Sequence, residues 1–429
     1  MIDVMLTSLI FLVTLFLIFS ERMNRTIAAM AGAALMVIFG LLRGFYTEEA
    51  AWQTLDFNTL GLLLGMMILV AILEPTGFFE YLAIMVGKKS SGNPARLLIL
   101  LGSVTTLTSM FLDNVTTVVL IAPITILICE ILGLNPQPYL MAEALLSDTG
   151  GVATLVGDPP NVLIGSAAEF SFVDFLTHSL PIVIVVWLVA LGVLLYLFRE
   201  ELSQQPVNIA ALEELQPKNA LVDRRAAQRL IWTLAGAIGL FLFEELLGVR
   251  PSLVALGAAT WALVWIQPPI KETLKRIQWD VLVFFAALFV MVGGLESAGV
   301  MSGLAELILH AQGFPPLGMG LALLWLVAIL SAVVDNVPIT IALIPVIQGL
   351  ASAGIEIAPL WWALVFGAGF GGNGTIIGST ANIVVASLSE KTQHPITPAV
   401  WNRRGLPVML ATCLAASGLY TLLFPLLTR

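Results

Sequence analysis

MFLDNVTTVVLIAP at residues 110–123 and SAVVDNVPITIALIP at residues 331–345 place the same Asp-Asn-Val motif inside apolar sequence, with a proline further on. Glu74 and Gly77 precede the first motif at the spacing at which Glu296 and Gly299 precede the second. Downstream, GGVATLVGDPPN (150–161) corresponds to GGNGTIIGSTAN (371–382), with the offset shifted by one residue. Acidic and amide residues that recur in apolar sequence at a fixed offset indicate two copies of one unit. This pattern is typical of secondary transporters with a site at the repeat interface.

The composition is that of a membrane protein. Hydrophobic residues make up 59% of the 429 residues and charged residues only 11%. Soluble domains are about 45–50% apolar and about 25% charged. The many apolar runs of span length favour membrane-crossing helices, and the alternating pattern of a β-barrel is absent. We therefore predict an all-α polytopic membrane protein, with the N-terminal run as its first span and not a cleaved signal.

The apolar runs predict about ten transmembrane helices, five in each half. The predicted spans are 4–20, 26–43, 57–86, 140–168 and 179–198, then 231–248, 252–266, 280–308, 358–388 and 405–427. Each of the stretches 97–133 and 319–350 predicts a re-entrant hairpin, because its motif lies near the middle, where a hairpin tip would be. An odd number of spans per half inverts the second half in the membrane. We expect inverted repeats at 1–199 and 230–429, joined by a cytoplasmic linker at 200–229.

The basic residues test this topology. With an extracytoplasmic N-terminus, all but three of the 19 Lys and Arg residues fall in predicted cytoplasmic loops, the exceptions being Arg43, Arg250 and Arg429. No Lys or Arg remains in the hydrocarbon, since Arg43 stands at the very end of its predicted span. Cytoplasmic loops are enriched in Lys and Arg, so the pattern predicts a multi-pass protein of the inner (plasma) membrane with both termini extracytoplasmic. The linker either ties the repeats together or docks a soluble partner.

Acidic side chains inside the predicted spans are the candidates for an ion path, because ionisable groups there are costly and tend to be functional. The proton-coupling candidates are Asp113, Asp148, Asp158, Asp335, Glu74 and Glu296. An Asp-Asn pair at a hairpin tip either caps the following helix or supplies oxygen ligands for a small cation or a proton. The recurrence of the pair favours the second role, and the two roles are compatible.

Both halves carry a predicted helix break at the midplane. Pro159 and Pro160 interrupt the first helix and leave Asp158 and Asn161 on unwound backbone. The second copy breaks at a run of glycines and has a polar lining of Asn373, Thr375, Ser379, Thr380 and Asn382. Glycines also serve close helix packing, but acid, amide and proline in register favour a site. Because Ser379 stands where the first copy has Asp158, we expect the main ion or proton site in the first half.

The other acids have less specific roles. Glu74 and Glu296 either carry protons or fix helix breaks, and Asp148 is either a ligand or a support for one. We assign the remaining acids to helix N-termini or to the membrane interface: Asp56 and Asp280 to the former, and Glu130, Glu143, Glu244 and Glu245 to the latter.

Several function classes are excluded. Cys129 and Cys413 are too far apart in sequence to form a motif, so we expect no cysteine metal cluster. The sequence has no Walker A motif, so the chain does not hydrolyse ATP by itself. No nucleophile is paired with a base. We therefore predict a protein that is not an enzyme, without a cofactor, a metal site or a nucleic-acid partner.

FLDNVTTVVLIAP, AEALLSDTGGVATLVGDPPNVLIG, DNVPIT and GGNGTIIGSTAN resemble the ArsB/NhaD permeases of the ion transporter superfamily over essentially the whole chain. The GDPPN wording is most similar to the branch with the melanosomal P protein and bacterial arsenite permease-like proteins. The resemblance implies hairpins, a site between hairpin tips and broken helices, and transport domains that move against a scaffold. The positions that match the family's site are Asp113, Asn114, Thr116, Asp158, Asn161, Asp335, Asn336, Thr375, Ser379 and Asn382.

The family handles arsenite and antimonite, sodium for protons, or carboxylates. A carboxylate substrate would find no Lys or Arg inside the membrane, and a helix dipole is worth only about 1–2 kcal/mol. Buried acids suit a cation, a proton, or a neutral polyhydroxyl species such as As(OH)3, and the lack of thiols suits its release. We therefore predict arsenite/antimonite efflux in exchange for protons.

Alternatives remain open. The chain is otherwise a sodium/proton antiporter, an anion or carboxylate carrier, a passive channel, or the membrane subunit of an ATP-driven metalloid pump. The coupling ion is a proton or, alternatively, sodium. The expected partners are the lipid bilayer and a small inorganic substrate, and the resemblance also allows a soluble arsenite-stimulated ATPase and a homodimer.

Overall fold

The computed structural model of the protein describes residues 2–19, 23–300, 315–352 and 354–428. Every element in these ranges is a helix, which confirms the predicted all-α class. Seven described helices are long and apolar enough to cross a membrane, and further apolar helices are 10–17 residues long. The end of the predicted span 280–308 lies outside the described residues, as do Arg22 and Arg429.

The described part of the first half contains thirteen helical elements before the connecting segment. These are α1 (Ile2–Phe19), α2 (Arg25–Arg43), α3 (Glu48–Gln53), α4 (Phe57–Leu73), η1 (Glu74–Thr76), α5 (Phe78–Lys89), α6 (Pro94–Ser109), α7 (Asn114–Leu132), α8 (Gln137–Gly151), α9 (Pro159–Ala168), α10 (Phe172–Asp174), η2 (Phe175–Ser179) and α11 (Leu180–Leu197). The connecting segment holds η3 (Glu201–Ser203), α12 (Ile209–Glu214) and α13 (Pro217–Ala220).

The second half repeats the order of the main helices. Its described elements are α14 (Arg224–Leu242), α15 (Glu244–Leu247), α16 (Pro251–Ile266), α17 (Ile270–Lys275), α18 (Trp279–Ser297), α20 (Pro316–Val333), α21 (Asn336–Ser352), α22 (Ala358–Gly371), η5 (Gly372–Gly374), η6 (Ile376–Gly378), α23 (Thr380–Ser389), α24 (Pro398–Leu422) and α25 (Phe424–Leu427). Helix α14 begins at Arg224, which lies within the predicted linker 200–229. The division of the chain into two repeats and a linker stays a prediction.

The predicted span 57–86 is divided into two helices at the helix break that the sequence allowed beside Glu74. Helix α4 ends at Leu73, and Gly77 adopts a φ of +75° before α5 begins. A side chain is strained at that φ, and a Cβ at this position would also collide with the backbone oxygen of Ala220. The bend places Glu74 in the lining of the cavity described below.

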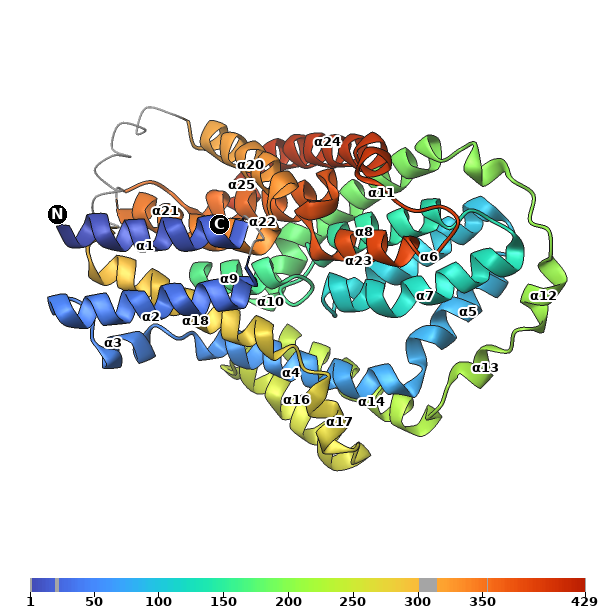
Figure 1. Cartoon of the computed structure of the whole chain (residues 1–429), viewed down its shortest axis with the longest axis horizontal. Helices are drawn as coiled ribbons and strands as arrows, with labels where there is room; N and C mark the ends of the chain where they lie inside the picture. Colours follow the sequence, from blue (N-terminus) through green and yellow to red (C-terminus); the bar gives the residue numbers. More distant parts are fainter. Residues whose placement is uncertain (1, 20–22, 301–314, 353, 429) are drawn as a thin grey trace.

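The two predicted hairpins are present, as α6–α7 and α20–α21. In Figure 1, α7 lies on the right-hand side and α21 on the left-hand side, so the hairpins approach the centre from opposite ends. This is the arrangement expected of inverted repeats. The tip of the first hairpin is fixed by Asp113, whose Oδ1 accepts the N–H of Thr116 at 2.9 Å.

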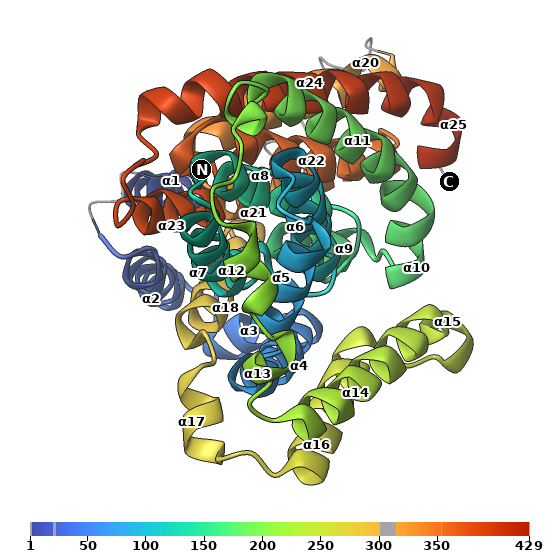
Figure 2. The ribbon, with the colours of Figure 1, turned by 90° about the vertical axis from the view of Figure 1, so that its right-hand side faces the viewer.

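The helices pack in two groups. In the outer group, α4 packs on α16 and α2 on α18; in the inner group, α6 packs on α8 and α20 on α22. The inner group comprises both hairpins together with the broken helices α8–α9 and α22–α23. Figure 2 shows α14 and α16 standing apart from the hairpin helices.

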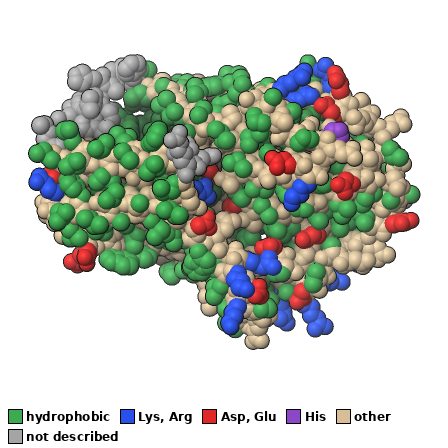
Figure 3. All heavy atoms as spheres, in the orientation of Figure 1, with side chains coloured by type: hydrophobic (Ala, Val, Ile, Leu, Met, Phe, Trp, Pro, Cys, Tyr) green, Lys and Arg blue, Asp and Glu red, His purple; other side chains and the backbone are tan. Residues whose placement is uncertain are grey.

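Hydrophobic side chains dominate the left-hand part of the face in Figure 3, whereas charged side chains gather toward the right and below. An apolar surface of this extent fits contact with lipid, since soluble proteins rarely expose large apolar patches.

Candidate functional site

A cavity of about 200 Å³ lies where the two hairpin tips and the two helix breaks meet the outer group. Its lining is unusually rich in polar side chains for the interior of an apolar protein. The polar residues of the lining are Arg25, Glu74, Asp113, Asn114, Thr116, Asp158, Arg276, Gln278, Asp335, Asn336, Ser379 and Thr380. The structure therefore brings together seven of the ten predicted binding residues.

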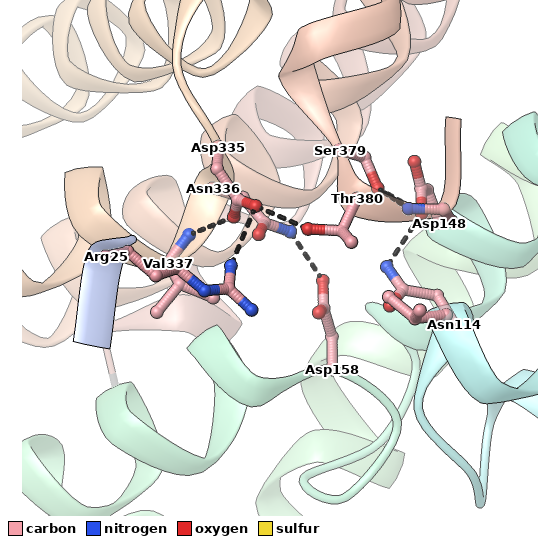
Figure 4. A network of polar contacts seen from close by, with 11 residues as sticks. Arg25, Asn114, Asp148, Asp158, Asp335, Asn336, Val337, Ser379 and Thr380 are labelled. Atoms are coloured by element: carbon pink, nitrogen blue, oxygen red, sulfur yellow. Dashed lines mark hydrogen bonds and ion pairs between the residues drawn. The ribbon is translucent and has the colours of Figure 1, made fainter. Parts of the chain in front are cut away.

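Hydrogen bonds join the two halves across this cavity (Figure 4). Asn336 donates from Nδ2 to Oδ2 of Asp158 at 3.0 Å. Asp148 accepts at Oδ1 from Asn114 at 2.7 Å and from Ser379 at 3.0 Å. All five side chains are at most 5% exposed. The cluster is a buried polar network built from both repeats.

Asp148 compensates for a difference between the repeats. Asp158 reaches the second hairpin tip directly, but its counterpart Ser379 has a shorter side chain. Asp148 lies between Ser379 and the first tip, and its own counterpart in the second half is Gly369. Thus both acids of the buried cluster come from the first half, in line with the expectation drawn from the Asp158/Ser379 difference.

Four helices begin at the cavity, namely α7, α9, α21 and α23. Asp113 and Ser379 accept hydrogen bonds from backbone N–H groups of α7 and α23, and Asp335 accepts that of Val337 at 3.2 Å. Asp158 precedes α9 but makes no such capping bond. Of the three carboxyl groups at these N-termini, that of Asp158 is therefore the one that does not cap a helix.

The sequence argument against a carboxylate substrate, that no Lys or Arg lies inside the membrane, missed two arginine side chains that line the cavity. Nη1 of Arg25 lies 3.3 Å from Oδ2 of Asp335, and Arg276 forms an ion pair with Glu74. Both arginines belong to segments that the sequence places in loops. Thr380 also donates to Asp335, at 2.7 Å. The reach of a long side chain from a loop into the interior carries no sequence signal, so neither arginine could be found by span counting.

Three of the predicted binding residues hold the helix breaks and do not line the cavity. Asn161 donates from Nδ2 to the carbonyl oxygens of Gly151 and Thr154, at 2.9 and 2.8 Å. Asn382 makes the matching bonds to Gly372 and Thr375, at 2.9 and 3.0 Å. The hydroxyl of Thr375 in turn donates to the backbone of the second hairpin at Ala332. These residues satisfy backbone groups that an interrupted helix leaves unpaired.

The matched acids Glu74 and Glu296 lie in different cavities. Glu74 lines the site, whereas Glu296 lines a second cavity of about 310 Å³ together with Asp56. The site also contains Gln278, the counterpart of Asp56 at the repeat offset, and Gln278 donates to Thr116 at 3.3 Å. The two cavities are thus lined by corresponding positions of opposite repeats, and Glu296 is separate from the central cluster.

Two acids that the sequence assigned to the membrane interface are buried within the protein. Glu143 is fully buried and accepts a hydrogen bond from the hydroxyl of Thr125. Glu244 is 6% exposed and accepts the N–H of Phe172 at 2.6 Å. A nearby proline-rich turn and a span end, respectively, suggested the interface, but helix packing brings both side chains inside.

The fold and the sequence both have known relatives. The crystal structure of the YdaH transporter of Alcanivorax borkumensis, which has an unusual topology, matches with a TM-score of 0.63 at 19% identity and covers 91% of this chain and 90% of that one. The 46 kDa membrane protein of Mycobacterium leprae is 39% identical over 96% of both chains. An uncharacterized transporter of Mycobacterium tuberculosis is 37% identical, also over 96% of both chains.

Human P protein is 31% identical over 92% of this chain, which covers 57% of P protein. The likeness to P protein that the GDPPN wording indicated is thereby confirmed, and the narrower likeness to arsenite permeases stays a prediction. Residues 15–367 match the family model described as citrate transporter. The chain is therefore an integral membrane transporter that belongs to the citrate transporter (CitMHS) family.

Proposed function

We propose that this protein is a proton-coupled carrier that exports As(OH)3 and Sb(OH)3 in exchange for protons. The charge of the cavity carries the proposal. Four carboxyl groups line it, against the guanidinium groups of Arg25 and Arg276. Each guanidinium is already paired with a carboxylate. In the described part of the chain, Asp113 and Asp158 have no ion-pair partner, so the cavity favours a proton, a cation or a neutral species.

The remaining lining suits a neutral hydroxylated molecule. Carboxyl, amide and hydroxyl groups of Asp158, Asn336 and Thr380 offer both donors and acceptors. Each As–OH group also donates and accepts. Neither Cys129 nor Cys413 lines the cavity, so the metalloid would be held by hydrogen bonds and not by thiolates. Weak, exchangeable binding is what a carrier needs in order to release its substrate.

Asp158 is the proposed coupling residue. It is 2% exposed, makes no capping bond, and contacts the tip of the opposite hairpin through Asn336. Substrate and proton would occupy the site in turn while the inner group moves against the outer group. The further proton-exchange candidates are Asp148 in the buried cluster and Asp113 and Asp335 in the cavity lining. The pair Arg25–Asp335 would open and close in this movement, because it joins α2 to the second hairpin.

A carboxylate carrier is the second candidate. The two arginines in the cavity favour it, as do the four helix N-termini, which attract anions. The description of the family model points the same way. A substrate carboxylate would then have to replace Asp335 or Glu74 as the partner of a guanidinium. A sodium/proton antiporter fits the unpaired acids as well, but no separate feature of the site favours it.

The test uses the purified protein in proteoliposomes with an entrapped pH-sensitive dye and an imposed pH gradient. Arsenite, antimonite, sodium and citrate are added in turn. We expect arsenite and antimonite to dissipate the gradient and sodium and citrate to leave it unchanged. Dissipation by citrate alone would establish the second candidate, and by sodium alone a cation antiporter. Because the vesicles contain no ATPase, gradient-driven transport would also make such a partner dispensable.

A further inference from the structure

The facing surfaces of α7 and α8 carry a row of polar side chains that leads away from the cavity. Glu143 on α8 accepts a hydrogen bond from Thr125 on α7. One helical turn nearer the cavity, Ser147 donates to the carbonyl oxygen of Asn114 at 3.4 Å, and Asp148 follows it. Thr117 follows Asn114 by three residues on α7, so the two share a helix face. Thr117 is fully buried, as are Glu143, Thr125 and Ser147.

The matching helix pair of the second half, α21 and α22, has no such row. In the order Thr117, Thr125, Glu143, Ser147 and Asp148, the residues at the repeat offset are Ile339, Ile347, Leu364, Ala368 and Gly369. These counterparts are buried as well. Because the same pair of helices packs with apolar residues at these positions, packing alone does not account for the polar ones.

Three atoms of the row have unused hydrogen-bonding capacity. Oγ1 of Thr117, Oε2 of Glu143 and Oδ2 of Asp148 are buried and have no hydrogen-bond partner among the described residues. Glu143 also has no ion pair in that part of the chain. Buried polar groups are normally satisfied, and an ionisable group inside a membrane protein indicates a function by default. The unsatisfied atoms mark the row as a place where something transient binds.

The row has a direction. Helix α7 ends at Leu132, and the connecting segment crosses this end, where Val207 donates to the carbonyl oxygen of Leu132 at 2.9 Å. At 1.5 Å per residue, Glu143 lies about 9 Å along α8 from its start at Gln137 and about 7.5 Å from Asp148. Glu143 is thus roughly midway between the linker-side end of the inner group and the acid cluster.

We propose that Glu143 is a proton-carrying residue and that the α7–α8 row conducts protons between the cavity and the linker-side end of the protein. Glu143 gives its proton from a carboxyl oxygen to the next acceptor in the row and takes another from the opposite direction. Only O–H bonds form and break, and the hydroxyl groups of Thr117 and Ser147 relay the proton toward Asp148. The inference rests on the proposed proton coupling and assigns its route.

The transport test compares the wild type with two variants in the dye-loaded proteoliposomes, with arsenite as the probe. Glu143→Gln keeps the shape of the side chain, and the double variant Thr125→Ile/Glu143→Leu copies the packing of the second half. We expect both variants to retain arsenite counterflow across the vesicle membrane when the pH is equal inside and outside. Arsenite-driven proton movement should fall by about a hundredfold or more, the scale on which a positioned proton-transfer group contributes. Wild-type proton movement in both variants would overturn the inference.

A second measurement does not depend on the substrate. Infrared difference spectra of the purified protein should contain a carboxylic C=O band that shifts in D2O, responds to pH and is missing in Glu143→Gln. If the band is absent or does not exchange, Glu143 is a structural residue and the inference fails. If it exchanges while arsenite moves no protons in the wild type, the proposed function fails and the proton-carrying residue stands.

Discussion

Asn336, at the tip of the second-half hairpin, donates a hydrogen bond to Asp158, in the helix break of the first half, across 3.0 Å. The corresponding amide of the first tip, Asn114, turns to Asp148 within its own half. The internal symmetry is therefore broken at the two acids that the cluster buries most deeply. A change in the charge of Asp158 acts directly on the opposite hairpin, which is the physical link that a coupled carrier needs.

Asp158→Asn should abolish coupling and preserve the fold. The new amide still offers an oxygen to Asn336, but it no longer exchanges a proton. We expect arsenite-driven proton movement in proteoliposomes to fall by about a hundredfold or more, with an unchanged melting temperature in detergent. Glu130→Gln is the control, since Glu130 is exposed and lies outside the cavity lining. Full activity of Asp158→Asn would sink the proposed role of this residue.

Arg25→Gln separates the two candidate functions. If the substrate is a neutral metalloid acid, loss of the guanidinium frees Asp335 and leaves transport measurable. If the substrate is a carboxylate, the same change removes its counter-ion, and citrate uptake should disappear. The matched control is Arg43→Gln. Arg43 forms an ion pair with Asp3 at 2.8 Å, and neither residue lines the cavity. A variant that transports both substrates like the wild type would mean that Arg25 has no part in the site.

Asn161→Ala and Asn382→Ala should destabilise the protein to a similar degree. Each change leaves two carbonyl oxygens without their donor, all of them buried except the half-buried one of Thr375. An unsatisfied buried group costs about 1–3 kcal/mol. Denaturant unfolding in detergent measures the loss of stability, with the exposed Asn219→Ala as the control. Wild-type stability combined with lost substrate binding would instead return these amides to the binding site, where the sequence placed them.

The sequence predicted those parts of the site that contain residues unfavourable in a transmembrane helix. An acid and an amide within an apolar run, and two prolines inside a span, conflict with a plain transmembrane helix wherever they occur. For that reason the tips at Asp113 and Asp335 and the breaks at Asp158 and Ser379 could be placed from the sequence alone. The repeat offset supplied the rest, since it implied that these four points meet.

The parts that failed depend on tertiary packing. Arg25 reaches the cavity because α2 lies beside α18, and its guanidinium stacks 5.6 Å from the ring centroid of Phe284 on that helix. The role of Asn161 follows from where two carbonyl groups point after the helix unwinds. Burial of Glu143 depends on the rotation of α8 against α7. Because α8 is buried over all but its first residue, it has no exposed polar face from which that rotation could be predicted.

Gly157→Ala tests whether the helix break has the geometry described. A Cβ at Gly157 would lie 2.6 Å from the carbonyl oxygen of Gly151 and 2.8 Å from that of Ser109, both of them backbone atoms of the inner group. Backbone atoms cannot move aside as a flexible side chain can, so the variant should lose folded protein and transport together. Gly378→Ala should behave alike, because a Cβ there would approach the backbone oxygens of Gly372 and Ser331.

The control is Gly192→Ala on α11, where a Cβ would meet nothing within 4 Å. Alanine in a helix interior is more stable than glycine by about 0.5–1 kcal/mol, so this variant should be neutral or slightly stabilised. Size-exclusion profiles and melting curves in detergent distinguish the cases. If Gly157→Ala folds and melts like Gly192→Ala, the backbone at Gly157 does not approach that of Gly151 and Ser109 as closely as the structure has it. The position of Asp158 must then be revised.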